Sequence, residues 1–193
     1  MKRIQPVIVL LFIVSAISAS AQEKKSPLSG VIGANFEFGG DRVAEIYFTN
    51  GNTQSVRAGQ GGHFYAGAEY RFPKAQKLAL RGTVGVKYVT TAADNAHIRL
   101  TRIPLQFTAN VYPVQKLRIA AGLSAHTGIR FNADGIMQNL SFQSANGPVF
   151  EIAYAGIGLT YTAMKYKNKE YGDVYSANAF GFSFSTTFGK KKK

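Results

Sequence analysis

Two residues near the middle of the chain have side chains that act together in many hydrolases. Ser124 and His126 are separated by one residue, so on a β-strand they share a face. A serine nucleophile also needs an acid that orients the histidine and donors that stabilise an oxyanion. The strand pattern described below points both side chains into a polar interior that a lipid substrate would not reach. We therefore expect no catalytic residue and no enzymatic activity, and a lipid-modifying barrel enzyme is the least favoured alternative.

The sequence indicates no metal or cofactor site. The other histidines, His63 and His97, stand alone, and the loop acids Asp41, Glu45 and Asp94 lack the spacing of a calcium-binding loop. Cysteine is absent, which excludes a thiolate metal site, a cysteine nucleophile and a disulfide. We therefore expect neither a metal ion nor a cofactor.

The N-terminus predicts export. Lys2 and Arg3 precede the apolar run Val7–Val14, and Ala19-Ser20-Ala21 is a small-residue pattern that signal peptidase recognises. A retained helical anchor is disfavoured because this run is much shorter than the ~20 residues needed to span a bilayer. We predict a signal peptide at 1–21, an N-terminal periplasmic linker at 22–29, one barrel domain at 30–189 and a basic tail at 190–193.

The chain is strongly basic, with a formal net charge of +13 that falls to +11 without Lys2 and Arg3. Such a charge is typical of proteins that bind nucleic acid. Export argues against that partner, and so does the dispersal of the basic residues along the chain. The one dense run, Lys190–Lys193, is expected to be solvated. We expect no nucleic-acid partner.

Alternation of apolar and polar residues is the dominant pattern of the mature chain, and no helical stripe persists for three turns. The alternation predicts strands at 32–38, 64–72, 78–88, 103–111, 117–126, 136–144, 149–161 and 180–188. The strand at 136–144 is the weaker one. Within 149–161 the apolar parity changes between Tyr154 and Ile157, which a bulge near Gly156 would reconcile. We count eight strands.

One face of these strands is apolar and the other is polar. We expect the apolar face to contact lipid through Phe36, Phe64, Leu80, Val84, Leu105, Phe107, Ile119, Leu123, Phe182 and Phe184. We expect the polar face to line the lumen with a network of Glu37, Tyr65, Glu69, Arg71, Arg81, Lys87, Arg118 and His126. If the apolar face pointed inward instead, the chain would be a soluble sandwich or a periplasmic, lipocalin-like ligand-binding barrel.

Three features favour the outward orientation. The polar face combines small and charged residues, long connections alternate with the short ones Pro73–Lys77 and Pro113–Lys116, and aromatic residues recur near strand ends. Outer-membrane barrels have short periplasmic turns, longer external loops and aromatic girdles. Strands cross lipid only in closed barrels, and an even strand number allows antiparallel closure. The predicted fold class is all-β: an eight-stranded antiparallel up-and-down transmembrane β-barrel.

The central hairpin carries a family resemblance. The segment Arg102-Ile103-Pro104-Leu105-Gln106-Phe107, a short turn and Leu117-Arg118-Ile119-Ala120-Ala121-Gly122 resemble the middle of porin-like outer-membrane β-barrel proteins of Bacteroidetes. These barrels commonly end on an aromatic residue, whereas here Phe188 is followed by Gly189 and four lysines. The resemblance implies a location in the bacterial outer membrane and no particular biochemical activity.

The functional expectation is a structural or surface-interaction role. An eight-stranded barrel is just wide enough for side chains to fill it, so we predict a plugged lumen, and a small ion-conducting pore is an alternative. We expect a monomer surrounded by outer-membrane lipids. The external loops at 39–61 and 165–176 mix basic and aromatic residues, among them Tyr166 and Tyr171, and would suit lipopolysaccharide or an acidic surface ligand. Solvated, disordered loops are the simpler interpretation.

Overall fold

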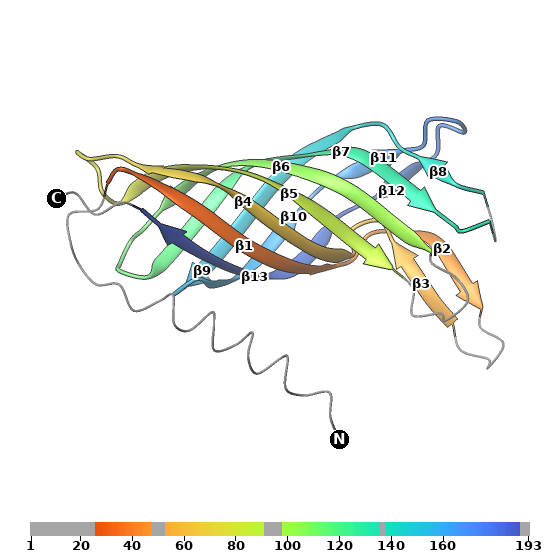
Figure 1. Cartoon of the computed structure of the whole chain (residues 1–193), viewed down its shortest axis with the longest axis horizontal. Helices are drawn as coiled ribbons and strands as arrows, with labels where there is room; N and C mark the ends of the chain where they lie inside the picture. Colours follow the sequence, from red (N-terminus) through yellow and green to blue (C-terminus); the bar gives the residue numbers. More distant parts are fainter. Residues whose placement is uncertain (1–25, 48–52, 91–97, 136–137, 190–193) are drawn as a thin grey trace, which may run out of the picture.

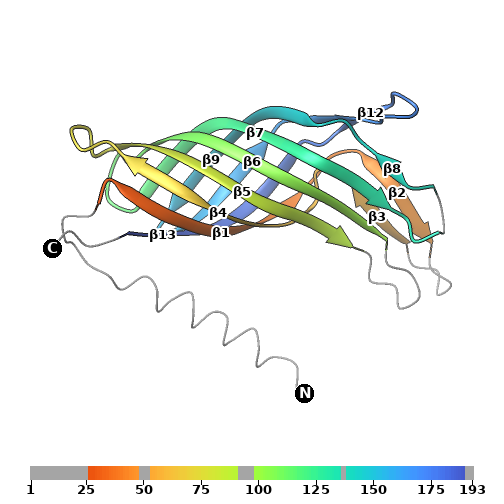
Figure 2. The ribbon, with the colours of Figure 1, turned by 45° about the horizontal axis from the view of Figure 1, so that its top comes forward.

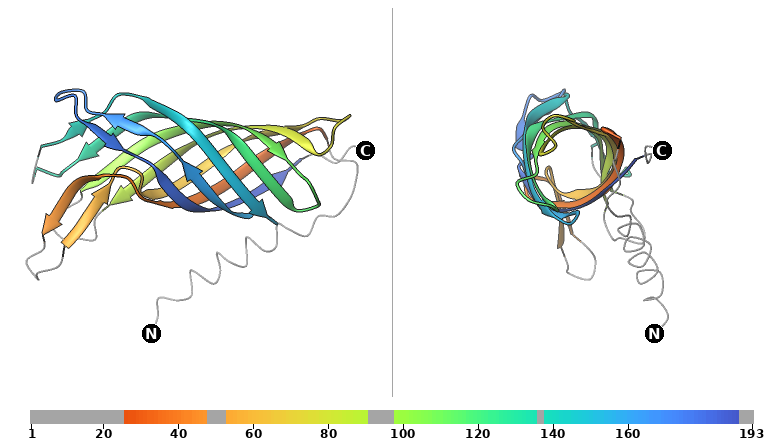
Figure 3. Two further views of the ribbon diagram at one scale, coloured as in Figure 1. Left: turned by 180° about the vertical axis from the view of Figure 1, so that it is seen from behind. Right: turned by 90° about the vertical axis from the view of Figure 1, so that its left-hand side faces the viewer.

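Eight long antiparallel strands close into a barrel in the computed structural model, which describes residues 26–47, 53–90, 98–135 and 138–189. The barrel strands are β1 (Leu28–Phe38), β4 (Gly61–Arg71), β5 (Leu78–Thr90), β6 (Arg99–Val111), β7 (Leu117–Asn132), β9 (Ala145–Tyr154), β10 (Ile157–Thr162) and β13 (Ala179–Phe188). The first and last strands pair, with Phe36 opposite Phe182, so the sheet has no open seam and forms a ring in Figure 3. The predicted all-β barrel of eight antiparallel strands is confirmed. The described residues contain no helix that is long and apolar enough to cross a membrane.

The two ends of the barrel differ in their connections (Figure 1). At one end, which we call the turn end, residues 72–77 join β4 to β5, residues 112–116 join β6 to β7, and residues 155–156 join β9 to β10. The opposite end, which we call the loop end, has longer connections that contain further short strands. These are β2 (Arg42–Tyr47), β3 (Thr53–Arg57), β8 (Leu140–Ser141), β11 (Lys165–Lys167) and β12 (Val174–Ser176).

The structure corrects two of the predicted strands. Among the described residues of 136–144, only β8 is a strand, and it pairs with the far end of β7 rather than spanning the barrel. Residues 149–161 form two strands, β9 and β10, and not one bulged strand. Ala155 and Gly156 have φ angles of 53° and 90°, and Tyr154 pairs with Ile157. Two consecutive residues with positive φ make a tight hairpin turn. The parity change is therefore a chain reversal, and the count of eight is correct because the two errors cancel.

An apolar core lies at the loop end. Its buried residues, which we call the loop-end core, are Ala44, Ile46, Val56, Ala58, Val89, Ile98, Leu100, Ile129, Phe131, Ala133, Phe142, Met164, Tyr166 and Ala177. Figure 2 shows β2, β3 and β8 gathered at this end. The described parts of 39–61 and 165–176 are therefore not solvated throughout. Ala44, Ile46, Val56, Ala58 and Tyr166 are buried in this core, whereas Lys165, Lys167 and residues 169–174 are exposed. Tyr166, expected on the external surface, is fully buried.

A bulge in β7 lies just below the loop-end core. Ile103 of β6 pairs with Thr127, whereas Thr101 pairs with Arg130, so β7 has an extra residue between these pairs. Gly128 has φ 58° there, a conformation that glycine adopts without steric cost. Beyond the bulge the alternation shifts by one residue, so Ile129 is buried in the loop-end core and Arg130 is exposed.

Candidate functional site

A first buried ion pair lies inside the barrel toward the turn end. Glu69 and Arg81 are direct cross-strand partners on β4 and β5. The guanidinium donates to one carboxylate oxygen from Nη2 at 2.6 Å and from Nε at 3.0 Å. The Tyr112 hydroxyl lies 2.8 and 2.9 Å from the two carboxylate oxygens, and Arg71 donates to Glu69 from the rim at 3.1 Å. One buried carboxylate is thus held by three donors from three strands or their ends.

A second ion pair lies across the lumen from the first. Arg118 binds Glu151 through two parallel hydrogen bonds of 2.8 and 2.5 Å, the bidentate geometry that is strongest for this pair. The Ser183 hydroxyl also donates to Glu151 at 2.6 Å. Ser185 accepts from both Arg81 and Arg118, at 3.5 and 3.3 Å. This serine links the two ion pairs into one network that crosses the barrel.

A third group of charges lies toward the loop end. Lys87 donates to Glu37 at 2.7 Å and to the carbonyl oxygen of Gly59 at 2.6 Å. Arg102 donates to the carbonyl oxygen of Gln60. Lys87 and Arg102 are each only 1% exposed. The turn at Ala58–Gln60, which we call the plug turn, is therefore held against the lumen by two buried cations.

Several buried polar atoms in this third group have no partner within the described part of the chain. They include Nε and Nη1 of Arg102, both ring nitrogens of His63 and Oδ1 of Asn35. His63 is the cross-strand partner of both Asn35 and Lys87. Buried groups of this kind are ordinarily satisfied by ordered water.

Tyr166 joins the loop end to the barrel wall. It comes from β11, and its hydroxyl lies 2.5 Å from Nδ1 of His126 on β7. Burial raises the pKa of Tyr166 to about 12, so the hydroxyl stays protonated at neutral pH. The Tyr166–His126 contact thus ties a side chain of the β10–β13 connection to the barrel wall within the loop-end core.

Ser124 and His126 do not form a catalytic pair with an acid. Both are buried. Ser124 accepts a hydrogen bond of 3.5 Å from Gln106 Nε2, while His126 contacts Tyr166. Within the described residues, no carboxylate forms a hydrogen bond with His126. His97 and Asp94, also considered from the sequence, lie outside the described residues, as do the predicted signal peptide and basic tail.

The structure buries most of the residues that the sequence assigned to the lumen. Buried inside the barrel are Glu37, Tyr65, Glu69, Arg81, Lys87, Arg118 and His126, whereas Arg71 is half-buried at the turn-end rim. Sequence reasoning did not name Arg102, Asn110, Tyr112, Glu151 or Ser183 as network members. The first three have the parity opposite to that of Leu105 and Phe107, which the sequence assigned to the apolar face. Parity therefore contained a signal for them, and equally for Glu151, which lies between the exposed Phe150 and Ile152.

The outward face is apolar and exposed. All of the residues expected there are exposed except the half-buried Leu80: Phe36, Phe64, Val84, Leu105, Phe107, Ile119, Leu123, Phe182 and Phe184. Phe64 and Leu123 are 67% and 65% exposed. Exposed aromatic side chains flank this band, with Phe38, Tyr88 and Phe180 toward the loop end and Tyr70, Tyr154 and Phe188 toward the turn end. The barrel thus has an inverted polarity, charged inside and apolar outside.

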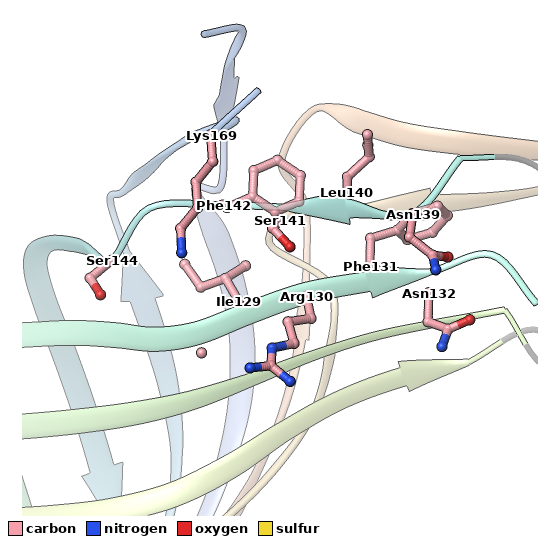
Figure 4. A pocket seen from close by; sticks show the side chains of 11 residues that line it. Ile129, Arg130, Phe131, Asn132, Asn139, Leu140, Ser141, Phe142, Ser144 and Lys169 are labelled. Carbon is pink, nitrogen blue, oxygen red and sulfur yellow. The ribbon is translucent and has the colours of Figure 1, made fainter. Parts of the chain in front are cut away.

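A polar pocket of about 380 Å³ lies at the loop end beside β7 and β8. Its lining includes Arg130, Asn139, Ser141, Ser144 and Lys169. Figure 4 shows Lys169 reaching the pocket from the segment after β11 and Arg130 reaching it from β7. The pocket is a separate feature from the lumen network. In the portion of the chain that the structure describes, no group of three histidine or acidic residues is placed to hold a metal ion.

The closed ring and the inverted polarity define an eight-stranded antiparallel β-barrel with buried ion pairs inside and an apolar outer face. The chain matches no model of a known protein family and no curated protein. A solved structure with a similar fold is Ail, the attachment invasion locus protein of Yersinia pestis, with a TM-score of 0.41 and 10% sequence identity. The likeness covers 82% of this chain and 97% of that one. At this TM-score the likeness carries no functional argument, so the assignment rests on the strand pairing.

Proposed function

We propose that this protein is an integral barrel of a bacterial outer membrane, with a plugged lumen and a structural or surface-interaction role. The observation that carries the proposal is the inverted polarity. Exposed apolar residues circle the barrel, while ion pairs occupy its interior. A soluble protein rarely exposes a contiguous apolar surface of this extent. A soluble ligand-binding barrel would need the opposite arrangement, with an apolar cavity inside.

The dimensions and strand pairing support a membrane location. Barrel strands such as β1, β4 and β6 have 11, 11 and 13 residues, and a tilted strand needs about 9–11 residues to cross a bilayer. Pairing of β1 with β13 leaves no barrel strand with an unpaired side in lipid. The aromatic side chains that flank the apolar band match the positions of interface girdles. Outer-membrane lipids are thus the proposed partners of the outward face.

The lumen network and the loop-end core support a plugged interior over a pore. Arg81, Arg118 and their acids cross the lumen toward the turn end, and the plug turn covers it toward the loop end. The loop-end core lies beyond the plug turn. A diffusing solute would have to pass the ion-pair network, the plug turn and the loop-end core. We propose that the barrel conducts no substantial ion current.

The loop end supplies the surface for an interaction role. Lys165, Lys167 and Lys169 are exposed there, and so is the aromatic ring of Tyr171. Exposed cations beside aromatic rings suit an anionic partner such as lipopolysaccharide or an acidic surface ligand. The sequence also suggested Tyr166 as a contact for this partner. Its side chain is buried, so the proposed surface does not include it.

The proposal is tested by gel mobility of the protein from isolated outer membranes, with and without boiling. Closed barrels keep their strand pairing in detergent at room temperature, so the unboiled protein is expected to migrate as a separate, faster band that boiling removes. A soluble periplasmic protein with one mobility would overturn the membrane location. Planar-bilayer recording tests the plugged lumen separately: we expect no stable open steps, and large steps would overturn that part alone.

A further inference from the structure

The pocket beside β7 and β8 contains two cationic side chains that no residue in the described ranges neutralises. The side chains of Arg130 and Lys169 are exposed and form no hydrogen bond or ion pair with those residues. Two other cations at the loop end are engaged: Arg42 pairs with Glu45, and Arg57 donates to the carbonyl oxygen of Gly40. Two unpaired cations on one concave surface attract an anion.

The β7 bulge is what places Arg130 at this pocket. Without an extra residue, the alternation of β7 would continue from Leu123 and would turn Arg130 inward. The bulge at Gly128 reverses the parity, so Ile129 enters the loop-end core and Arg130 points outward. Bulges commonly re-aim side chains at functional sites. A buried arginine in an apolar core would be costly, so the same bulge both completes that core and directs the charge to the pocket.

The position of the pocket relative to the apolar band indicates the kind of anion. The outermost apolar residue of β6 on the outward face is Ile103, which is 45% exposed and pairs with Thr127. Arg130 pairs with Thr101, two residues farther along β6, which is about 7 Å at the rise of a β-strand. If the apolar band lies in the hydrocarbon region, Arg130 lies at the level of the lipid headgroups.

The lining provides neutral donors beside the two cations. The side-chain amide of Asn139 and the hydroxyls of Ser141 and Ser144 face the same volume of about 380 Å³. The Asn139 carbonyl oxygen already accepts from the backbone N–H of Ala133, which leaves its amino group to face the pocket. Oxygen-rich anions are recognised by such combinations of cations and neutral donors. The volume falls within the range of small-molecule sites.

We propose that this pocket binds the phosphate group of an anionic lipid headgroup, with Arg130 and Lys169 as its charge partners. The inference rests on the proposed membrane location, because that location puts the pocket beside headgroups. It goes further by identifying a site, a ligand class and the residues that recognise it. Basic pockets at the headgroup level bind phosphorylated lipids in other membrane proteins.

The test uses the full-length mature protein in nanodiscs of phosphatidylcholine with a minor fraction of phosphatidic acid, and native mass spectrometry measures the retained phosphatidic acid. The double variant Arg130→Gln/Lys169→Gln is expected to retain about tenfold less of it, since a change of about 1.4 kcal/mol corresponds to tenfold. The matched control is Arg57→Gln/Lys74→Gln, which removes the same charges from exposed residues outside the pocket. This control is expected to retain phosphatidic acid like the unmodified protein.

Three outcomes would overturn the inference. The double variant could retain as much phosphatidic acid as the unmodified protein, or the control could lose as much of it as the double variant. The protein could also bind inorganic phosphate in neutral detergent through Arg130 and Lys169 without retaining the lipid. The last outcome would identify a free-phosphate site. Heat-dependent gel mobility is measured for every variant. A protein without the faster unboiled band contradicts the proposed membrane barrel itself, whereas a variant with that band and unchanged lipid retention contradicts only the pocket.

Discussion

Lys87 and Arg102 lie opposite each other on β5 and β6, and each donates to a different carbonyl group of the plug turn. Lys87 also neutralises Glu37, whereas Arg102 has no carboxylate partner in the described residues. A segment that looks like part of a flexible loop in the sequence is thus fixed by the barrel wall. If the plug turn closes the lumen as we propose, this contact is expected to couple that closure to stability.

Replacing Lys87 tests that coupling. The substitution Lys87→Met leaves the buried carboxylate of Glu37 without its cation, and we expect a loss of about 3–5 kcal/mol in the free energy of unfolding. Urea titration of the protein in lipid vesicles, followed by the fraction of the faster unboiled band, measures this loss. Lys165→Met, on an exposed residue, is the control and should leave the midpoint unchanged. Equal midpoints for the two variants would show that the plug turn does not depend on Lys87.

The Glu69–Arg81 pair allows a double-mutant cycle. Glu69→Gln and Arg81→Met each leave an uncompensated partner in the lumen, and each is expected to destabilise the barrel by about 3 kcal/mol or more. The double variant should be less destabilised than the sum of the two, by at least about 1 kcal/mol, because the two groups interact directly. Additive losses in the same urea titration would mean that this contact does not contribute to stability.

Gly67 marks a position where a side chain cannot fit. A β-carbon at Gly67 would lie 2.0 Å from the backbone oxygen of Gly82, whereas a β-carbon at Gly82 would meet only the Phe107 ring at 3.9 Å. We expect Gly67→Ala to lower stability by about 1–3 kcal/mol or to prevent closure, and Gly82→Ala to be tolerated. The yield of the faster unboiled band after refolding distinguishes the two. A tolerated Gly67→Ala would mean that β4 and β5 are less closely apposed at this point.

We expect a mutation in the loop-end core to loosen the loop-end connections while the barrel strands stay paired. Phe142→Ala removes a fully buried ring from this core, a change that typically costs about 3–5 kcal/mol. We expect faster proteolysis of the loop-end connections while the unboiled barrel band remains. Tyr171→Ala, which removes an exposed ring at the same end, is the control. Equal cleavage rates in both variants would contradict a packed core at this end.

Sequence alternation predicted the barrel well where strands are long and one face is uniformly apolar. Phe180, Phe182 and Phe184 are all exposed on one face of β13, and the charges of Glu69 and Arg81 are buried as their parity indicates. A strict period of two carries this information because neighbouring side chains point to opposite faces. The outward direction of the apolar face was predicted from the composition of the polar face, the alternation of long and short connections and the aromatic residues near strand ends.

The remaining features depended on contacts that periodicity does not contain. The hairpin at Ala155-Gly156 looked like a bulge, because a two-residue turn and a bulge both shift parity by one position. The loop-end core escaped detection because its members come from several connections and from the loop ends of three barrel strands, as Ile46, Phe142 and Phe131 do. The pocket was missed for a related reason: Arg130 and Lys169 are far apart in sequence, and the glycine bulge that turns Arg130 outward has no distinct signature.

The composition of the loop-end core sets an order for assembly. Its residues come from all four long connections: Ile46 lies between β1 and β4, Ile98 between β5 and β6, Phe142 between β7 and β9, and Met164 between β10 and β13. No partial set of strands brings these four together, since contacts that are distant in sequence must wait for the chain between them to be placed. We therefore expect the complete core to form after the eight strands are in position, so that its burial comes late in folding. An immature barrel would display these apolar residues to folding factors and proteases, whereas a finished one hides them.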